Sequence, residues 1–141
     1  MTTAVPEDAL VLAGGGHSHA LVLRRWAMHP ERKPRRPVIL VNRHSTALYS
    51  GMGPGLIAGI YQRQDAAIDL RRLAARAGVA LVIAEITGVD RTGKQLELSQ
   101  RPPLRFGLLS LDVGAETRPS GGMPIKPLEP ALAFLEAEDL E

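Results

Sequence analysis

The sequence has no cysteine among its 141 residues, which excludes disulfide bridges, thiolate metal sites and a redox-active pair of thiols. Aromatic residues make up only 4% of the chain, too few to suggest a stacking surface for nucleic acid. No apolar run approaches the roughly 20 residues that span a bilayer, and the N-terminus lacks the pattern of a signal peptide. We therefore expect a cytoplasmic protein without a transmembrane segment.

The balance of charges adds a further exclusion. Lysine and arginine total 17 against 15 acidic residues, a formal charge of +2, so charge alone indicates no nucleic-acid partner. The length is that of one ordinary domain, and the hydrophobic fraction of 45% is typical of a globular fold.

The first half of the chain has the pattern of a βαβ unit. Residues Asp8 to Ala13 form a short apolar run that ends in three glycines, as a buried parallel strand does at a tight turn. A helix is predicted over His19 to Ala27, and Val38 to Val41 form a second strand. This order implies a parallel sheet with a right-handed crossover.

The rest of the chain continues an α/β pattern. We predict a loop with a short helix near Pro54, a helix that Asp69 caps and Gly78 ends, and a strand over Val79 to Ala84. A β-hairpin or meander follows at 85–98. We then predict a further turn over Arg101 to Leu104 and a last strand over Leu108 to Val113. The predicted fold is a three-layer, Rossmann-like α/β domain with a central parallel sheet and a β-meander.

The glycine turn carries the chemistry. Gly14 permits the sharp turn, and Gly16 lets a pyrophosphate approach the backbone N–H groups at the positive end of a helix. Two positions depart from the dinucleotide-binding pattern: His19 replaces the third glycine, and Asn42 replaces the acidic residue that binds ribose. The amide of Asn42 can still bond a ribose hydroxyl, and Arg43 favours a phosphate, which leaves an NADP-like site open.

Other interpretations of this segment remain. The turn can bind nothing, or another anion. His17 is a candidate donor to a bound phosphate, whereas His17 and His19 lack a neighbouring carboxylate that would complete a metal site. Ser18 lacks the second glycine of a hydrolase nucleophile motif. We therefore assign no catalytic residue and no metal ligand.

Four segments resemble the N-terminal region of a flavoprotein family, the pyridine nucleotide-disulfide oxidoreductase-like (NADH-dehydrogenase-like) proteins that are often fused to selenide, water dikinase. They read LVLAGGGHSHALVL, VILVNRHSTALYSGMGPGLIAGIY, IDLRRLAARAGV and RPPLRFGLLSLDVGAETR. The resemblance implies an oxidoreductase with FAD on this domain and NAD(P)H on a second one. It also implies hydride transfer to the flavin, since cysteines are absent.

By this resemblance, Gly14 and Gly16 hold the pyrophosphate, and Asn42 and Arg43 lie by the adenosine ribose. The backbone near Ile86 meets the adenine, the segment from Tyr49 to Pro54 approaches the flavin ring, and Gly114 ends the strand beside the cofactor. His19 and Asn42 are departures from the wider pattern.

The expected domain organisation follows from the same reasoning. Residues 1–7 form an N-terminal tail, 8–118 the FAD-binding domain, and 119–141 a linker with a short acidic helix from Ala131 that leads to an absent second domain. We expect this fragment to be inactive alone. Its expected partners are FAD, the missing NAD(P)H-binding domain and a fused selenide, water dikinase, with self-association through apolar surface left exposed.

Overall fold

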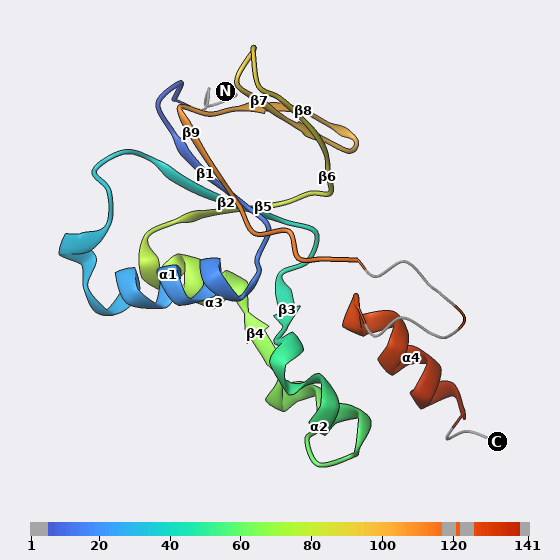
Figure 1. Cartoon of the computed structure of the whole chain (residues 1–141). Helices are drawn as coiled ribbons and strands as arrows, with labels where there is room; N and C mark the ends of the chain where they lie inside the picture. The colour runs from blue at the N-terminus through green and yellow to red at the C-terminus, as the bar shows by residue number, and fades with distance from the viewer. Residues whose placement is uncertain (1–5, 117–120, 122–125, 139–141) are drawn as a thin grey trace. The chain divides into compact units, whose positions relative to one another are not determined.

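The structure is a computed structural model that describes residues 6–116, 121 and 126–138. Its contacts divide the chain into two compact units (Figure 1). The first comprises the chain up to Ser45 together with Asp69–Val113, and the second comprises Thr46–Ile68 together with the chain from Gly114. The boundaries expected from the sequence, at 7/8 and 118/119, stay predictions.

The first unit is built on a sheet of four parallel strands in the order β5-β2-β1-β9. Leu10 pairs with Val38 on one side and with Leu108 on the other, so the central strand β1 has a neighbour at each edge. All four strands therefore end at the same edge of the sheet. Their bounds are β1 Leu10–Ala13, β2 Val38–Asn42, β5 Ala80–Ile83 and β9 Leu108–Leu111.

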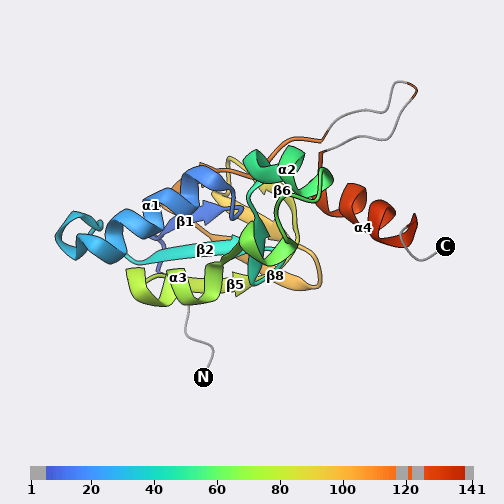
Figure 2. The same cartoon turned by 90° about the horizontal axis from the view of Figure 1, so that it is seen from below.

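Two helices that contact each other, α1 (His17–Met28) and α3 (Leu70–Ala77), cover one face of this sheet (Figure 2). Helix α3 begins and ends as predicted. Asp69 Oδ1 accepts the backbone N–H of Arg72 at 2.9 Å, and Gly78 takes the left-handed conformation with φ 63°. A single 3-10 turn, η1 (Pro30–Arg32), follows α1.

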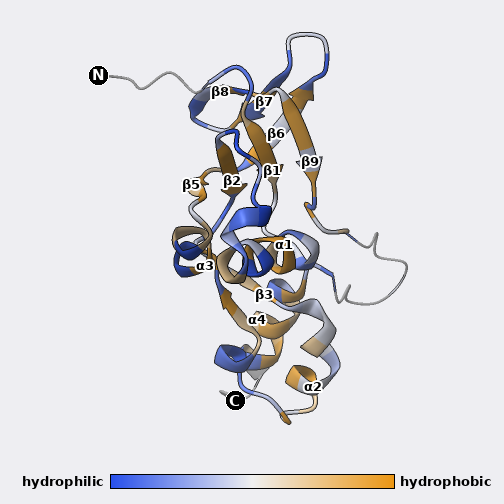
Figure 3. Cartoon of the chain, turned by 90° about the vertical axis from the view of Figure 1, so that its left-hand side faces the viewer, coloured by the Kyte–Doolittle hydropathy of each residue, from blue (hydrophilic) through white to orange (hydrophobic). Residues whose placement is uncertain are grey.

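A three-stranded antiparallel meander packs on the other face of the sheet. Because side chains alternate along a strand, Val11 and Val41 point toward the meander, where they meet Leu96 and Phe106. Figure 3 shows apolar residues concentrated in the strands of the central sheet. The predicted meander is confirmed, with strands β6 Ile86–Asp90, β7 Gln95–Leu98 and β8 Arg101–Arg105.

The turn predicted over Arg101 to Leu104 is wrong, because these residues belong to β8. The chain reverses earlier, at Ser99 and Gln100, where Gln100 adopts φ 57°. The two prolines of β8, Pro102 and Pro103, suggested a turn. They are tolerated here because β8 is an edge strand of the meander and its pairing with β7 shifts register between Leu96 and Leu98.

The second unit has a small apolar core of its own, formed by Leu56, Ala66, Leu128 and Leu132. The predicted short helix near Pro54 is confirmed as α2, Gly53–Ile57. Helix α4, Leu128–Glu138, begins earlier than expected. Its Pro130 is tolerated in the first turn, where the backbone N–H has no acceptor within the helix. The other elements are β3 Thr46–Leu48, η2 Ser50–Met52, η3 Arg63–Asp65 and β4 Ala67–Asp69.

In the part of the chain that the structure describes, no helix has the length and apolar character needed to cross a membrane.

Candidate functional site: the glycine turn between β1 and α1

The glycine turn lies at the carboxyl edge of the parallel sheet, where β1 ends and α1 begins. From β1 the chain crosses over through α1 to β2 on one side, while β9 lies on the other side of β1. The connections therefore diverge at β1. In open α/β sheets, ligands bind in the crevice that such a divergence leaves at the carboxyl ends of the strands.

Each glycine of the turn is held close to other atoms. Gly14 has φ 94°, and a Cβ placed on it would lie 2.2 Å from the backbone oxygen of Asp112. A Cβ on Gly16 would lie 2.3 Å from Oδ1 of the same aspartate, and one on Gly15 would lie 2.3 Å from a methyl carbon of Leu70. The turn therefore has room for glycine alone unless these neighbours move.

Asn42 ends β2 and is bonded at both ends of its side-chain amide. Its Oδ1 accepts the Gly15 N–H at 2.9 Å, and its Nδ2 donates to the His44 carbonyl at 2.8 Å. The sequence suggested that this amide bonds a ribose hydroxyl. The structure shows that it fixes the glycine turn and the loop after β2, and each amide atom retains capacity for a second bond.

Arg43 lies next to Asn42 and pairs with Glu85, in the segment between β5 and β6. The Arg43 Nη2 and Glu85 Oε1 are 2.8 Å apart, and both side chains are more than half exposed. The carboxylate therefore offsets the positive charge that the NADP-like interpretation assigned to Arg43. An exposed pair of this kind contributes at most about 1 kcal/mol to stability.

His19, which occupies the third glycine position, is held by several hydrogen bonds. The His19 side chain projects from the first turn of α1, and the residue is only 4% exposed. Its Nδ1 lies 2.7 Å from the Gly14 carbonyl oxygen, and its Nε2 lies 2.9 Å from Ser110 Oγ. The imidazole thus joins α1 both to the turn and to strand β9.

Asp112 completes this arrangement from the residue after β9. Its Oδ2 accepts the backbone N–H of His19 at 3.0 Å. Helix α1 has Gly16 as its N-cap and no acidic residue in its first turn, so it has no cap of its own. The Asp112 carboxylate replaces one, at the helix end where negative charge is favoured.

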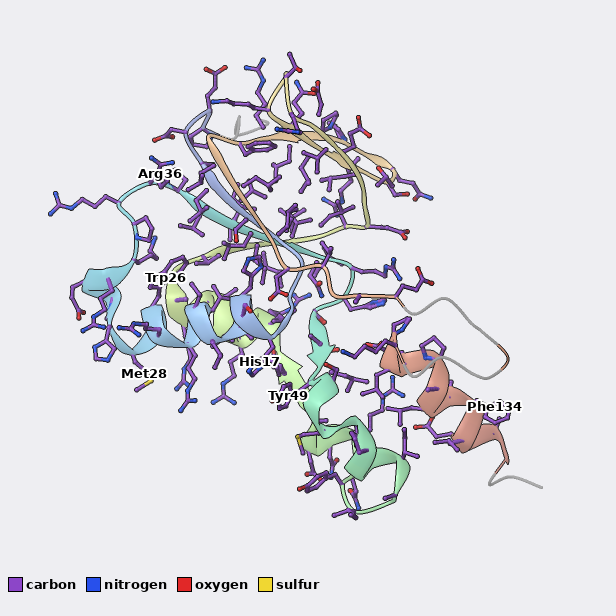
Figure 4. All side chains as sticks on the ribbon, viewed as in Figure 1. His17, Trp26, Met28, Arg36, Tyr49 and Phe134 are labelled. Carbon is purple, nitrogen blue, oxygen red and sulfur yellow. The ribbon has the colours of Figure 1, made fainter. Side chains whose placement is uncertain are left out.

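The structure brings together Gly14, Gly16, His17 and Asn42, four of the residues expected to bind a cofactor. His17 is the first residue of α1 and lies at the start of that helix in Figure 4. Arg43 is adjacent. Ile86 opens β6, where it pairs with Leu98 and packs against the apolar core of the first unit.

The remaining expected residues belong to the second unit and its own contacts. The Tyr49 N–H donates to the Ala66 carbonyl at 2.8 Å, and a Cβ on Gly51 would lie 2.5 Å from the Tyr49 ring. Pro54 is in the first turn of α2. Gly114 has φ 77°, with open space where a Cβ would lie.

Sequence reasoning missed the roles of Ser110 and Asp112 at this site. Both residues lie in the last predicted strand, Leu108 to Val113, and the sequence assigned neither of them a role at the site. The available signal was the pattern LLSLDV at 108–113, where two polar residues two positions apart interrupt an apolar strand. Residues at that spacing face the same side of a strand, and here both bond His19.

Comparisons with known proteins place the fold. No family model matches the chain, and no curated protein matches it. Among solved structures, the reduced CoADR-RHD of Bacillus anthracis matches with TM-score 0.66 and 19% identity over 84% of this chain and 22% of its own. The sulfide:quinone oxidoreductase of Aquifex aeolicus matches with TM-score 0.65 and 14% identity over 77% of this chain and 25% of its own.

A third match is NDH2 from Plasmodium falciparum in complex with NADH, with TM-score 0.62 and 16% identity over 80% of this chain and 23% of its own. The chain thus spans about a quarter of the length of these structures. At such identities the likeness concerns the fold. The chain has the Rossmann-like α/β fold of FAD- and NAD-binding proteins, with a central parallel sheet and a meander.

Proposed function

We propose that this chain binds FAD non-covalently and forms the FAD-binding part of an NAD(P)H-dependent flavoprotein oxidoreductase. The observation that carries the proposal is the glycine turn, which lies where the sheet connections diverge and leads into α1. The fold is shared with a sulfide:quinone oxidoreductase and with an NDH2 solved with NADH, which supports this class of activity.

The backbone at the start of α1 supplies the pyrophosphate contact in this proposal. The N–H groups of Gly14, Gly15 and Gly16 already bond within the protein, to the Val41 carbonyl, the Asn42 side chain and the Asp112 carbonyl respectively. Asp112 also takes the His19 N–H. We expect the anion beside these glycines at the first turn of α1, where the positive end of the helix dipole favours negative charge.

The adenosine end is proposed to lie along the carboxyl ends of β2 and β5. Asn42 and Arg43 lie at the end of β2, and the segment from Glu85 to Ile86 follows β5, the neighbouring strand. A ribose hydroxyl is expected at the Asn42 amide, and the adenine at the backbone near Ile86. The roles of Tyr49, Pro54 and Gly114 stay predictions from the resemblance.

The chemistry of a bound flavin is to accept a hydride from NAD(P)H and to pass the electrons onward. The protein's part is positional, since the sequence offers no cysteine that could form a redox dithiol. The proposal requires an NAD(P)H-binding domain as partner, and a selenide, water dikinase is a further proposed partner.

Two alternatives use the same turn. An NAD(P)-binding domain is favoured by the guanidinium of Arg43 beside Asn42, and a non-catalytic module is favoured by the number of turn N–H groups that the protein itself satisfies. The three functions differ in ligand preference. Selective binding of FAD is expected of the proposed function, and preference for a nicotinamide nucleotide is expected of an NAD(P)-binding domain. A non-catalytic module would bind a nucleotide without redox activity or, if purely structural, would leave the turn empty.

The test is an absorbance spectrum of the purified chain, followed by calorimetric titration with FAD, NAD⁺ and NADP⁺. We expect selective binding of FAD that Gly16→Val abolishes. Gly88→Val is the matched control, because its Cβ would also meet a carboxylate oxygen at 2.3 Å, that of the exposed Glu97 on the meander. Preference for NAD⁺ or NADP⁺, or FAD binding that survives Gly16→Val, would contradict the proposal.

A further inference from the structure

The hydrogen bond of His19 to Gly14 determines which nitrogen carries the hydrogen in the neutral imidazole. The Gly14 carbonyl oxygen can only accept, so Nδ1, at 2.7 Å, carries the hydrogen and donates it. In the neutral ring Nε2 is then an acceptor, and Ser110 Oγ, at 2.9 Å, donates to it. Both ring nitrogens of this nearly buried side chain are therefore satisfied by groups on two different elements.

Gly14 is the residue of the turn that most needs to be held. Its φ of 94° lies outside the conformations that other residues adopt easily, and its carbonyl is held by the His19 ring. The same histidine is fixed through its backbone by Asp112. A third glycine ordinarily lets a helix and strand pack closely at this position, whereas here a side chain fills the gap and bonds across it.

We infer that His19 is a positioning residue for nucleotide binding: its imidazole holds the turn at Gly14 and strand β9 in the geometry that directs the first N–H groups of α1 toward an anion. The inference rests on the proposed function, because it specifies how that site is kept in its binding geometry. His19, Ser110 and Asp112 form one unit, hereafter the His19 clasp. Ser110 and Asp112 contribute from the same side of the β9 segment.

Matched variants distinguish this positioning role of His19 from a merely structural one. Asn at position 19 has a side-chain NH₂ near the place of Nδ1, so His19→Asn restores the donor to Gly14 and loses the bond to Ser110. His19→Ala loses both. Leu23→Val is the packing control, since Leu23 is fully buried on the same helix and is apolar. Ser110→Ala removes one bond and leaves the imidazole in place.

Two measurements are made on the whole chain: hydrogen exchange of the Gly15 and Gly16 amides by NMR, and calorimetric affinity for FAD. His19→Ala is expected to speed exchange and weaken affinity by about tenfold each, the loss that corresponds to one or two hydrogen bonds. His19→Asn should recover most of the protection from exchange and most of the affinity. Ser110→Ala should speed exchange and weaken affinity by about threefold each. Leu23→Val should lower the melting temperature and leave the exchange rates and the affinity within about twofold of wild type, well below the roughly tenfold change expected of His19→Ala.

The inference is overturned if His19→Ala keeps wild-type exchange and affinity, if Leu23→Val causes the same losses, or if His19→Asn is as impaired as His19→Ala. Should no form of the chain bind FAD, the proposed function fails. In that case the exchange rates alone decide whether His19 holds the turn, so the two failures are distinguishable.

Discussion

Asn42 Oδ1 accepts the backbone N–H of Gly15 at 2.9 Å, and this single bond joins the end of β2 to the turn that follows β1. The other end of the same amide donates to the His44 carbonyl, so one side chain fixes two loops at the carboxyl edge of the sheet. Asn42 occupies the position where an acidic residue usually binds ribose, and in this structure its side chain holds two loops together.

Replacement of Asn42 by alanine should therefore lower both stability and nucleotide affinity. The loss of two side-chain hydrogen bonds is expected to reduce the free energy of unfolding by about 1–2 kcal/mol, measured by urea denaturation. Asn42→Asp keeps the acceptor for Gly15 and adds a carboxylate suited to a ribose hydroxyl, but it loses the donor to the His44 carbonyl, so FAD affinity should recover only in part relative to Asn42→Ala. If Asn42→Asp proves as weak in FAD binding as Asn42→Ala, this role is contradicted.

Gly14 should tolerate no side chain, in contrast to a glycine with a similar backbone angle elsewhere. A Cβ on Gly14 would lie 2.2 Å from a backbone oxygen, whereas Gly59, with φ 70°, has open space at the corresponding point. Gly59→Ala is expected to cost about 1–2 kcal/mol of stability from the left-handed conformation alone. Gly14→Ala should cost more and should abolish FAD binding, as thermal denaturation and calorimetry can show.

The pair of Arg43 and Glu85 should govern discrimination against NADP⁺. Glu85→Gln removes the carboxylate that offsets the guanidinium, so NADP⁺ affinity is expected to rise by about threefold to tenfold, with FAD affinity unchanged. Arg43→Ala should have the opposite effect on NADP⁺. Glu7→Gln, which breaks the ion pair of Glu7 with Arg105, is the control and should change neither affinity. Equal affinities in the wild type and all three variants would exclude a role for the pair.

Much of the fold could be predicted from local signals. The apolar runs bounded by glycine identified β1 and β9, and the Asp69 cap with the Gly78 stop identified α3, because these signals depend on residues close in sequence. Strand β8 was missed, since paired prolines favour a turn locally and only the outer position in the meander makes a strand acceptable. Strand β3, in a loop rich in glycine, was missed as well.

The candidate site was predictable only in part for the same reason. The glycine turn is a contiguous motif, so Gly14 and Gly16 stood out in the sequence. The His19 clasp joins residues 91 and 93 positions apart, and such bonds exist only once the parallel sheet brings β9 beside β1. Its histidine therefore looked like a departure from a motif.

Strand β9 should promote self-association of the chain. It forms one end of the central sheet, and three apolar side chains on and beside it, Leu108, Leu111 and Val113, are 55–65% exposed. Leu111→Lys is expected to shift the sedimentation distribution toward monomer, whereas Val89→Lys on the meander should not. A wild-type chain that remains strictly monomeric at high concentration would contradict the prediction.

The two prolines of β8 have a consequence beyond the register of the meander. Pro102 and Pro103 have no N–H groups, so the outer margin of the meander offers an incomplete row of donors to any approaching strand. This margin is protected against the growth of intermolecular β-structure, while β9 carries no proline and keeps its donors. During folding at high concentration, misassembly is accordingly expected at the free edge of β9 rather than at the edge of β8.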